Sequence, residues 1–254
     1  MRPSTGCRST YTLGMSRPLV IAHRAGPLDA DPPAAENSIS GMRASLELGA
    51  DAVEIDVRLS LSGTPVLMHD ITARRTGGFP APVRLMSEQQ LNRTRLYRAK
   101  EPIPTLAAML AAVPDGVPIA ADVKDPRVMR ATIEVARAAG RLADVMLWCR
   151  SAKAIRLAGR AAPECKLGYL HDSGNDRETL AYIRATIGLG AHIVSIHERA
   201  TTPATVRAAQ DAGLIAYAWA LTADSHRRLL DAGVDGIVTD YPGVLRKQIG
   251  PVTV

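Results

Sequence analysis

The stretch that decides the fold is VEIDVRLSLSGTPVLMHD, residues 53–70. It contains two apolar segments, separated by a turn at Ser62 and Gly63. Because a connection between parallel strands needs about a dozen residues or more, these segments are predicted to pair as an antiparallel hairpin. Charged side chains stand within both strands, and a carboxylate buried in a strand is costly unless a partner satisfies it.

Three other segments share one pattern, in which a helix gives way to a strand. Each has a glycine that can end a helix in the left-handed conformation, followed by a short turn and a β-branched run. The segments are LGADAVEIDV (48–57), LGAHIVSIHE (189–198) and AGVDGIVTDY (232–241). Alternating helices and apolar strands are typical of a parallel α/β fold.

Nine segments have the composition of strands: residues 18–23, 52–57, 64–69, 118–124, 144–149, 165–170, 192–197, 215–221 and 236–240. The segment at 64–69 is the returning arm of the hairpin, so eight parallel strands remain. We therefore predict an α/β fold, a single (β/α)8 TIM barrel with a β-hairpin and a short insertion after the second strand.

The chain of 254 residues is long enough for one such barrel. The barrel is expected to span residues 17–254, after a flexible N-terminal extension at residues 1–16. Residues 70–103 contain the loop-like sequence TGGFPAPVR and are expected to form a small insertion above the active-site face.

Composition limits the partners of the chain. Hydrophobic residues make up 46% and charged residues 22%, which is ordinary for a globular protein. The net charge of +6 comes mainly from scattered arginines, without the clustered basic patch that marks nucleic-acid binding. No signal peptide and no run of about 18 apolar residues is found, so we expect a cytoplasmic protein without stable membrane insertion. The number of subunits is not predicted.

The cysteines, Cys7, Cys149 and Cys165, are odd in number and follow no metal-binding spacing. A disulfide framework or a zinc site is therefore not expected. Cys149 and Cys165 are expected to pack as small apolar residues.

Polar residues gather at the carboxyl ends of the predicted strands, where a TIM barrel places its chemistry. Glu54 and Asp56 are two apart on one strand and point to the same side, and Asp122 occupies a similar place on the next barrel strand. Three converging carboxylates repel one another unless a cation lies between them. Ligation by oxygen alone favours Mg²⁺ or Ca²⁺, so we predict a divalent cation site.

Two histidines join this rim, since His23 and His69 each end an apolar run. Imidazoles on either side of a phosphodiester can serve as general base and general acid, because they titrate near neutral pH. Arg24 and Lys124 add positive charge for a phosphoryl oxygen. This combination favours phosphodiester cleavage over sugar or aldol chemistry.

These residues also resemble a known family. The N-terminal half is similar to a glycerophosphodiester phosphodiesterase in its IAHRAG, AENS, EID and LMHD motifs, and EPIPTL, ADVK, WALT and GVDGIVTDYP continue the likeness. Each motif alone is weak, but the ordered set is specific. The resemblance extends from Val20 to Pro242.

The resemblance implies a role for each matching residue. His23 and His69 would be the acid/base pair, Arg24 and Lys124 would contact the phosphate, and Trp219 would lie against the glycerol moiety. Glu54, Asp56 and Asp122 would hold the cation, with Glu36 and Asn37 supporting the site. The family mechanism implies attack by a glycerol hydroxyl on phosphorus, followed by hydrolysis of a cyclic phosphate to glycerol 3-phosphate.

The chain departs from the family pattern at several positions. Ala25 interrupts the H-R-G motif, and Asp122 is one methylene shorter than the glutamate expected there. Ser38 is a mild change from threonine, whereas Ala220 and Thr222 alter the region near the polar end of the substrate. These departures bear on the preference for a leaving alcohol.

Other functions stay open on the same scaffold: a lysophospholipase D, a lyase that stops at the cyclic phosphate, and a barrel that binds phosphodiesters without catalysis. Lys124 can also be a structural partner of Asp122, and Trp219 an ordinary core residue.

Several polar residues receive no role. Asp240 is expected only to cap or brace the loop after the last strand, and His226 to face solvent from a helix. His171, His192 and His197 are not assigned.

Overall fold

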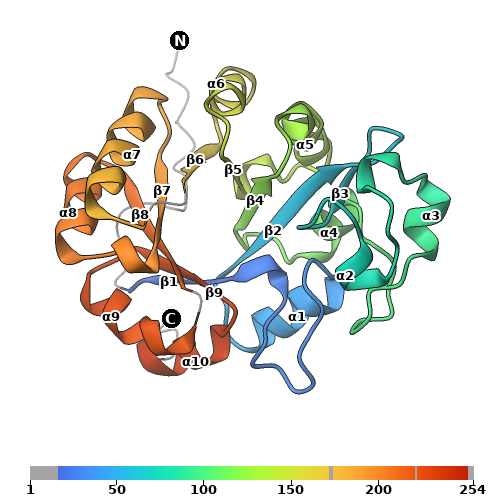
Figure 1. The fold of residues 1–254 in the computed structure, drawn as a ribbon, viewed down its shortest axis with the longest axis horizontal. Helices are drawn as coiled ribbons and strands as arrows, with labels where there is room; N and C mark the ends of the chain where they lie inside the picture. The colour runs from blue at the N-terminus through green and yellow to red at the C-terminus, as the bar shows by residue number, and fades with distance from the viewer. Residues whose placement is uncertain (1–16, 172–173, 221, 251–254) are drawn as a thin grey trace, which may run out of the picture.

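The structure is a computed structural model that describes residues 17–171, 174–220 and 222–250. The predicted extension at 1–16 lies outside the described residues. Eight parallel strands form a closed barrel (Figure 1). They are β1 (Leu19–Ala22), β2 (Ala52–Leu59), β4 (Ile119–Val123), β5 (Val145–Cys149), β6 (Lys166–Leu170), β7 (Ile193–His197), β8 (Ile215–Ala220) and β9 (Gly236–Thr239). The strand order β1-β9-β8-β7-β6-β5-β4-β2 is closed by pairing of β1 with β2, which confirms the (β/α)8 barrel.

The predicted hairpin is also confirmed. Strand β3 (Pro65–Leu67) lies outside the barrel and pairs antiparallel with the end of β2, with Val57 opposite Leu67. Gly63 takes a φ of +82° in the connecting turn, a conformation that suits glycine. The hairpin turns the chain back, so that residues just after β3 meet the rim of the barrel.

Helices cover the outside of the barrel (Figure 1). They are α1 (Ile39–Glu47), α4 (Leu106–Ala112), α5 (Met129–Ala138), α6 (Ala152–Ala161), α7 (Asp176–Gly188), α8 (Pro203–Asp211), α9 (His226–Asp231) and α10 (Pro242–Ile249). The glycines of the three repeated segments, Gly49, Gly190 and Gly233, have φ values of +90°, +67° and +81° after α1, α7 and α9. The repeats are therefore helix ends, as predicted.

The core has two layers that follow the alternation of side chains along each strand. On β2, Val53, Ile55 and Val57 pack outward beneath the helices. The barrel interior is filled by a second set: Leu19, Ile21, Ala52, Ala120, Met146, Trp148, Leu170, Ile193, Tyr217 and Val238. Glu54 and Asp56 alternate with the outward residues, so they belong to the interior.

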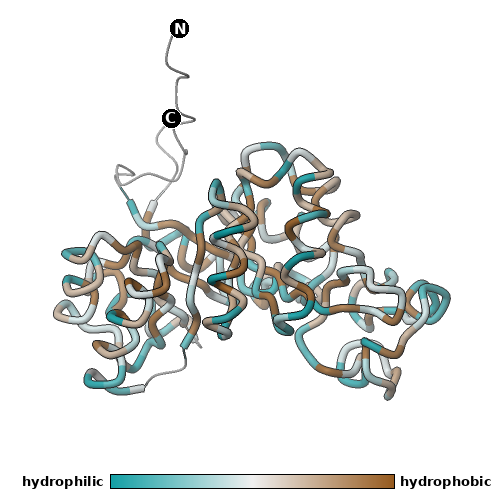
Figure 2. The backbone as a smooth tube through the Cα atoms, turned by 90° about the horizontal axis from the view of Figure 1, so that it is seen from above, coloured by the Kyte–Doolittle hydropathy of each residue, from teal (hydrophilic) through white to brown (hydrophobic). Residues whose placement is uncertain are grey.

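Residues 70–103 form a lobe beside β3. The lobe contains α2 (Arg74–Gly77), the 3₁₀ turn η2 (Val83–Leu85) and α3 (Glu88–Arg93), and Figure 2 shows it at one end of the molecule. A small core joins the lobe to the hairpin: Ala35, Val66, Met68, Ala73, Val83, Met86, Leu91, Leu96 and Ile103. Five further 3₁₀ turns are η1 (His23–Ala25), η3 (Pro126–Val128), η4 (Leu142–Asp144), η5 (Glu198–Ala200) and η6 (Ala223–Ser225).

One expectation is wrong. His226 does not face solvent but is fully buried, and its Nε2 lies 2.8 Å from Oγ1 of Thr239. The helical spacing explains the burial, because His226 is three residues before the buried Leu229 and shares its face of α9.

Cys149 and Cys165 are buried and free, as predicted, and burial raises the pKa of Cys165 to about 12. Cys7 lies outside the described residues. Among the helices that the structure describes, none is both long and apolar enough to span a membrane.

Candidate active site

Three buried carboxylates converge at the mouth of the barrel. Glu54 and Asp56 come from β2, and Asp122 comes from β4, where it is in register with Asp56. One oxygen of each lies within 4.8 Å of one oxygen of the others. The structure thus brings together the three residues that the sequence predicted as cation ligands.

Lys124 lies against two of the three carboxylates. Nζ of Lys124 lies 2.7 Å from Oδ1 of Asp56 and also contacts Oδ2 of Asp122. Burial and the charge of Asp56 raise the pKa of Glu54 to about 8. Burial would raise the pKa of Asp56 too, but Lys124 lowers it below the usual value. A cluster that offers only carboxylate oxygens as ligands fits a hard cation such as Mg²⁺ or Ca²⁺.

The loop after β1 brings Arg24 and Asn37 to this cluster. The backbone N–H of Arg24 donates to Oε2 of Glu54 over 2.7 Å, and its Nε lies 3.7 Å from Oδ2 of Asp56. Asn37 donates from Nδ2 to Oδ2 of Asp56 and accepts from the backbone N–H of Asp56, at 2.7 and 2.9 Å. These two hydrogen bonds let Asn37 fix the orientation of Asp56, one of the three candidate cation ligands.

His23 is held by the last strand of the barrel. Its Nδ1 lies 2.7 Å from Oδ1 of Asp240, and because a carboxylate only accepts, Nδ1 carries the proton. Burial lowers the pKa of His23, but the hydrogen bond to Asp240 and the charge of Glu54 outweigh burial and raise it. The sequence prediction gave Asp240 no part in the site, although its position at the end of a strand was a usable signal.

His69 is held by its neighbour in the chain. Its Nδ1 lies 2.8 Å from Oδ1 of Asp70, and Arg75 donates from Nε to Oδ2 of Asp70 over 2.7 Å. The hydrogen bond from Arg75, together with that from His69, lowers the pKa of Asp70 to about 2. Arg58 donates to the backbone carbonyl of His69 over 2.9 and 2.6 Å, which anchors the chain after the hairpin.

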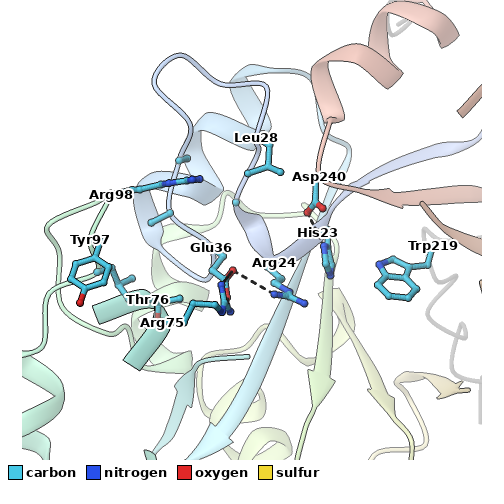
Figure 3. A pocket seen from close by; sticks show the side chains of 14 residues that line it. His23, Arg24, Leu28, Glu36, Arg75, Thr76, Tyr97, Arg98, Trp219 and Asp240 are labelled. Carbon is cyan, nitrogen blue, oxygen red and sulfur yellow. Dashed lines mark hydrogen bonds and ion pairs between the residues drawn. The ribbon is translucent and has the colours of Figure 1, made fainter. Parts of the chain in front are cut away.

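Glu36 connects the lobe to the loop after β1. It accepts two hydrogen bonds from Arg75, at 2.8 and 2.6 Å, and a longer one of 3.4 Å from Arg24 (Figure 3). Arg75 is not among the predicted site residues, because it lies in the insertion and matches no motif.

Two adjoining cavities open at the rim. The inner cavity, of about 320 Å³, is lined by both histidines, by Glu54, Asp122 and Lys124, and by Trp219. The outer cavity, of about 700 Å³, lies between the loop after β1 and the lobe. Both cavities share His23, Arg24 and Trp219. The ring of Trp219 lies 6.0 Å from that of His23 and 5.4 Å from that of His197.

Comparison with known proteins decides the family. Residues 23–244 match the Glycerophosphoryl diester phosphodiesterase family. The chain belongs to this family. A glycerophosphodiester phosphodiesterase from Caldanaerobacter subterraneus subsp. tengcongensis is 27% identical over 240 residues, which cover 89% of this chain and 96% of that protein. Human glycerophosphodiester phosphodiesterase 1 is 36% identical over 118 residues, 43% of this chain and 34% of the human protein.

Solved structures agree on the fold. An Oleispira antarctica phosphodiesterase in complex with sn-glycerol-3-phosphate has a TM-score of 0.78 at 22% identity, covering 92% of this chain and 97% of that one. A Thermotoga maritima glycerophosphodiester phosphodiesterase has a TM-score of 0.75 at 21% identity, covering 91% and 98%. These likenesses establish the barrel of the family.

The glycerophosphoryl diester phosphodiesterase fold accommodates the two main departures of this chain. Ala25 is fully buried with a φ of +46°, a left-handed conformation that glycine would adopt more easily. Asp122 reaches the carboxylate cluster despite its shorter side chain, because its Cα is in register with that of Asp56.

Proposed function

We propose that this chain hydrolyses glycerophosphodiesters to glycerol 3-phosphate and an alcohol. The observation that carries the proposal is a pair of histidines, His23 and His69, which line one cavity together with Glu54 and Asp122 of the carboxylate cluster. Each histidine has an aspartate at Nδ1, which leaves Nε2 as the atom for proton transfer. Family membership and the phosphodiesterase relatives support the same reaction.

In the first step, one histidine would act as the general base and the other as the general acid. His69 would accept a proton at Nε2 from a glycerol hydroxyl, whose oxygen attacks phosphorus and forms a cyclic phosphate. His23, which lines both cavities, would donate a proton from Nε2 to the oxygen of the departing alcohol. The raised pKa of His23 favours the protonated form that a general acid requires.

The second step would reverse these assignments. His23 would accept a proton from water, whose oxygen opens the cyclic phosphate, while His69 returns its proton to the glycerol oxygen. Both histidines would then be back in their initial states, so the net reaction consumes one water.

Charge on the phosphoryl group would be offset by this chain's cations and by a bound ion. Glu54, Asp56 and Asp122 would hold a divalent cation, Mg²⁺ or Ca²⁺, which when bound polarises a phosphoryl oxygen. Arg24 and Lys124 would add fixed positive charge near the phosphate. Trp219 would give the glycerol moiety an apolar surface, and Glu36 and Asn37 would support the loop and the cluster.

The test is phosphorus NMR of the products from a panel of glycerophosphodiesters and lysophospholipids, with an enzymatic assay for glycerol 3-phosphate. We expect glycerol 3-phosphate to accumulate and His23→Ala and His69→Ala to abolish it. A cyclic phosphate that persists would favour the lyase. Release of lysophospholipid headgroups in preference to those of glycerophosphodiesters would favour a lysophospholipase D. Binding without turnover, unchanged in both variants, would favour a non-catalytic barrel.

A further inference from the structure

The outer cavity opens directly from the rim at which the chemistry proposed above would take place. It is about twice as large as the inner cavity, at about 700 against about 320 Å³. His23 lies in the lining of both, whereas His69 lines the inner cavity. A diester held between the two histidines would therefore have one substituent in each cavity, with the outer one on the side of His23.

The inner cavity suits the glycerol side of the substrate. Its lining includes polar groups from Arg150, His171, Ser195 and His197, which can meet hydroxyl groups. The outer cavity has a different wall, which mixes apolar side chains such as Leu28 and Leu96 with basic ones. The outer cavity is therefore the place for the alcohol that leaves.

The charged side chains that line the outer cavity differ in whether they are already paired with another group. Its two carboxylates are engaged, since Glu36 accepts from Arg75 and Asp240 from His23. Arg98 lines the same cavity and, among the residues that the structure describes, makes no hydrogen bond or ion pair. In Figure 3 the guanidinium of Arg98 points toward the middle of the pocket, from the side opposite Trp219. An uncommitted guanidinium attracts an anion and repels a cation.

We propose that the outer cavity binds the leaving alcohol and that Arg98 makes it selective for alcohols carrying a carboxylate or phosphate. This inference rests on the proposed function, because it assigns one side of the same diester. Within the described residues, the cavity offers a quaternary ammonium headgroup the rings of Trp219 and Tyr97 but no unpaired carboxylate.

The test compares glycerophosphoserine with glycerophosphoethanolamine, whose leaving alcohols differ only by a carboxylate. We expect wild-type protein to favour glycerophosphoserine in kcat/KM. Arg98→Gln should lower kcat/KM for glycerophosphoserine about tenfold, which corresponds to loss of one charge-assisted hydrogen bond of about 1.4 kcal/mol. The same variant should leave glycerophosphoethanolamine within about twofold of wild type.

The matched control is Arg84→Gln, which removes the same charge from an exposed arginine of the lobe that does not line the outer cavity. It should change neither substrate. An equal loss for both substrates in Arg98→Gln, an unchanged ratio, or the same selective loss in Arg84→Gln would each overturn the proposal. Failure of wild-type protein to release glycerol 3-phosphate from any diester would contradict the proposed function itself, and this inference with it.

Discussion

At the scale of single residues, the two histidines differ in how their aspartates are held. Asp70 adjoins His69 in the chain and receives a further hydrogen bond from Arg75. Asp240 meets His23 from 217 residues away and receives no such bond from another side chain among the described residues. His23 is therefore the histidine whose protonation depends most on one tertiary contact.

Asp240→Asn should lower kcat about 100-fold, which is part of the rate acceleration that a general acid provides. The amide cannot hold the Nδ1–H tautomer in the same way and no longer raises the pKa of His23. The limb of the pH profile that reports the acid should therefore shift to lower pH, with a smaller change in KM. The measurement is kcat and KM for glycerophosphoethanolamine between pH 5 and 9.

An unshifted profile in Asp240→Asn, with kcat close to that of wild type, would refute the positioning role. Asp115→Asn supplies the control, because Asp115 is a fully exposed aspartate on the surface.

Ala25→Gly should be tolerated unusually well. The substitution loses a buried methyl group, worth about 0.8 kcal/mol, but relieves a left-handed conformation that costs an L-residue about 1–2 kcal/mol. We expect the free energy of unfolding to stay within about 1 kcal/mol of wild type. Urea denaturation followed by circular dichroism measures the change.

Ala158→Gly is the matched control for Ala25→Gly, since Ala158 is equally buried but lies inside helix α6. It should lose about 1.5–2 kcal/mol, from the methyl group and from helix propensity. An equal loss for both variants would show that the conformation of residue 25 stores no strain.

At the scale of elements, Asp51 ties three parts of the barrel together at the start of β2. It accepts from the backbone N–H of Val20, at 2.9 Å, and from Arg17 and Arg246. Burial would raise the pKa of Asp51, but the hydrogen bonds from Arg17, Val20 and Arg246 lower it. This carboxylate therefore joins β1, β2 and α10.

The stability from Asp51 should be present at neutral pH and lost in acid. Because its folded pKa lies below the unfolded value of about 3.9, the contribution is complete above that value and disappears as pH falls through the folded pKa. Asp51→Asn should lower the free energy of unfolding at pH 7 by about 2 kcal/mol and reduce its dependence on pH between about 5 and 3. Urea titrations at each pH measure both effects, and an unchanged slope would contradict the assignment.

At the scale of the whole molecule, pairing of β2 with β4 creates the carboxylate cluster, because these strands are neighbours in the barrel although the hairpin and the lobe separate them in the sequence. Any ion that binds the cluster should therefore stabilise the entire fold by linkage. Saturating Mg²⁺ or Ca²⁺ should raise Tm by about 5 °C, since ~100 Kd of ligand contributes ~2.7 kcal/mol.

Chelation with EDTA should remove both the increase in Tm and the phosphodiesterase activity. Asp56→Asn should lose the increase, whereas Asp115→Asn, an exposed aspartate outside the cluster, should keep it. Scanning calorimetry with and without each ion checks this prediction. An ion-induced increase in Tm that persists in Asp56→Asn, or full turnover in the presence of EDTA, would contradict the proposed cation site.

The sequence by itself determined the barrel and which polar residues gather at its rim. Connection length made the second arm of VEIDVRLSLSGTPVLMHD a hairpin, and the alternation of side chains put Glu54 and Asp56 on one face. Both are local properties of the chain, so they can be read without knowing what lies across the barrel.

Only the tertiary structure decided which distant groups meet. The contacts of Asp240 with His23 and of Arg75 with Glu36 join segments that no spacing rule relates, and the burial of His226 depends on where α9 lies against β9. The outer cavity likewise exists because the lobe lies against the loop after β1. A side chain's partners in such contacts are set by how segments far apart in the chain pack together, which no local sequence pattern records.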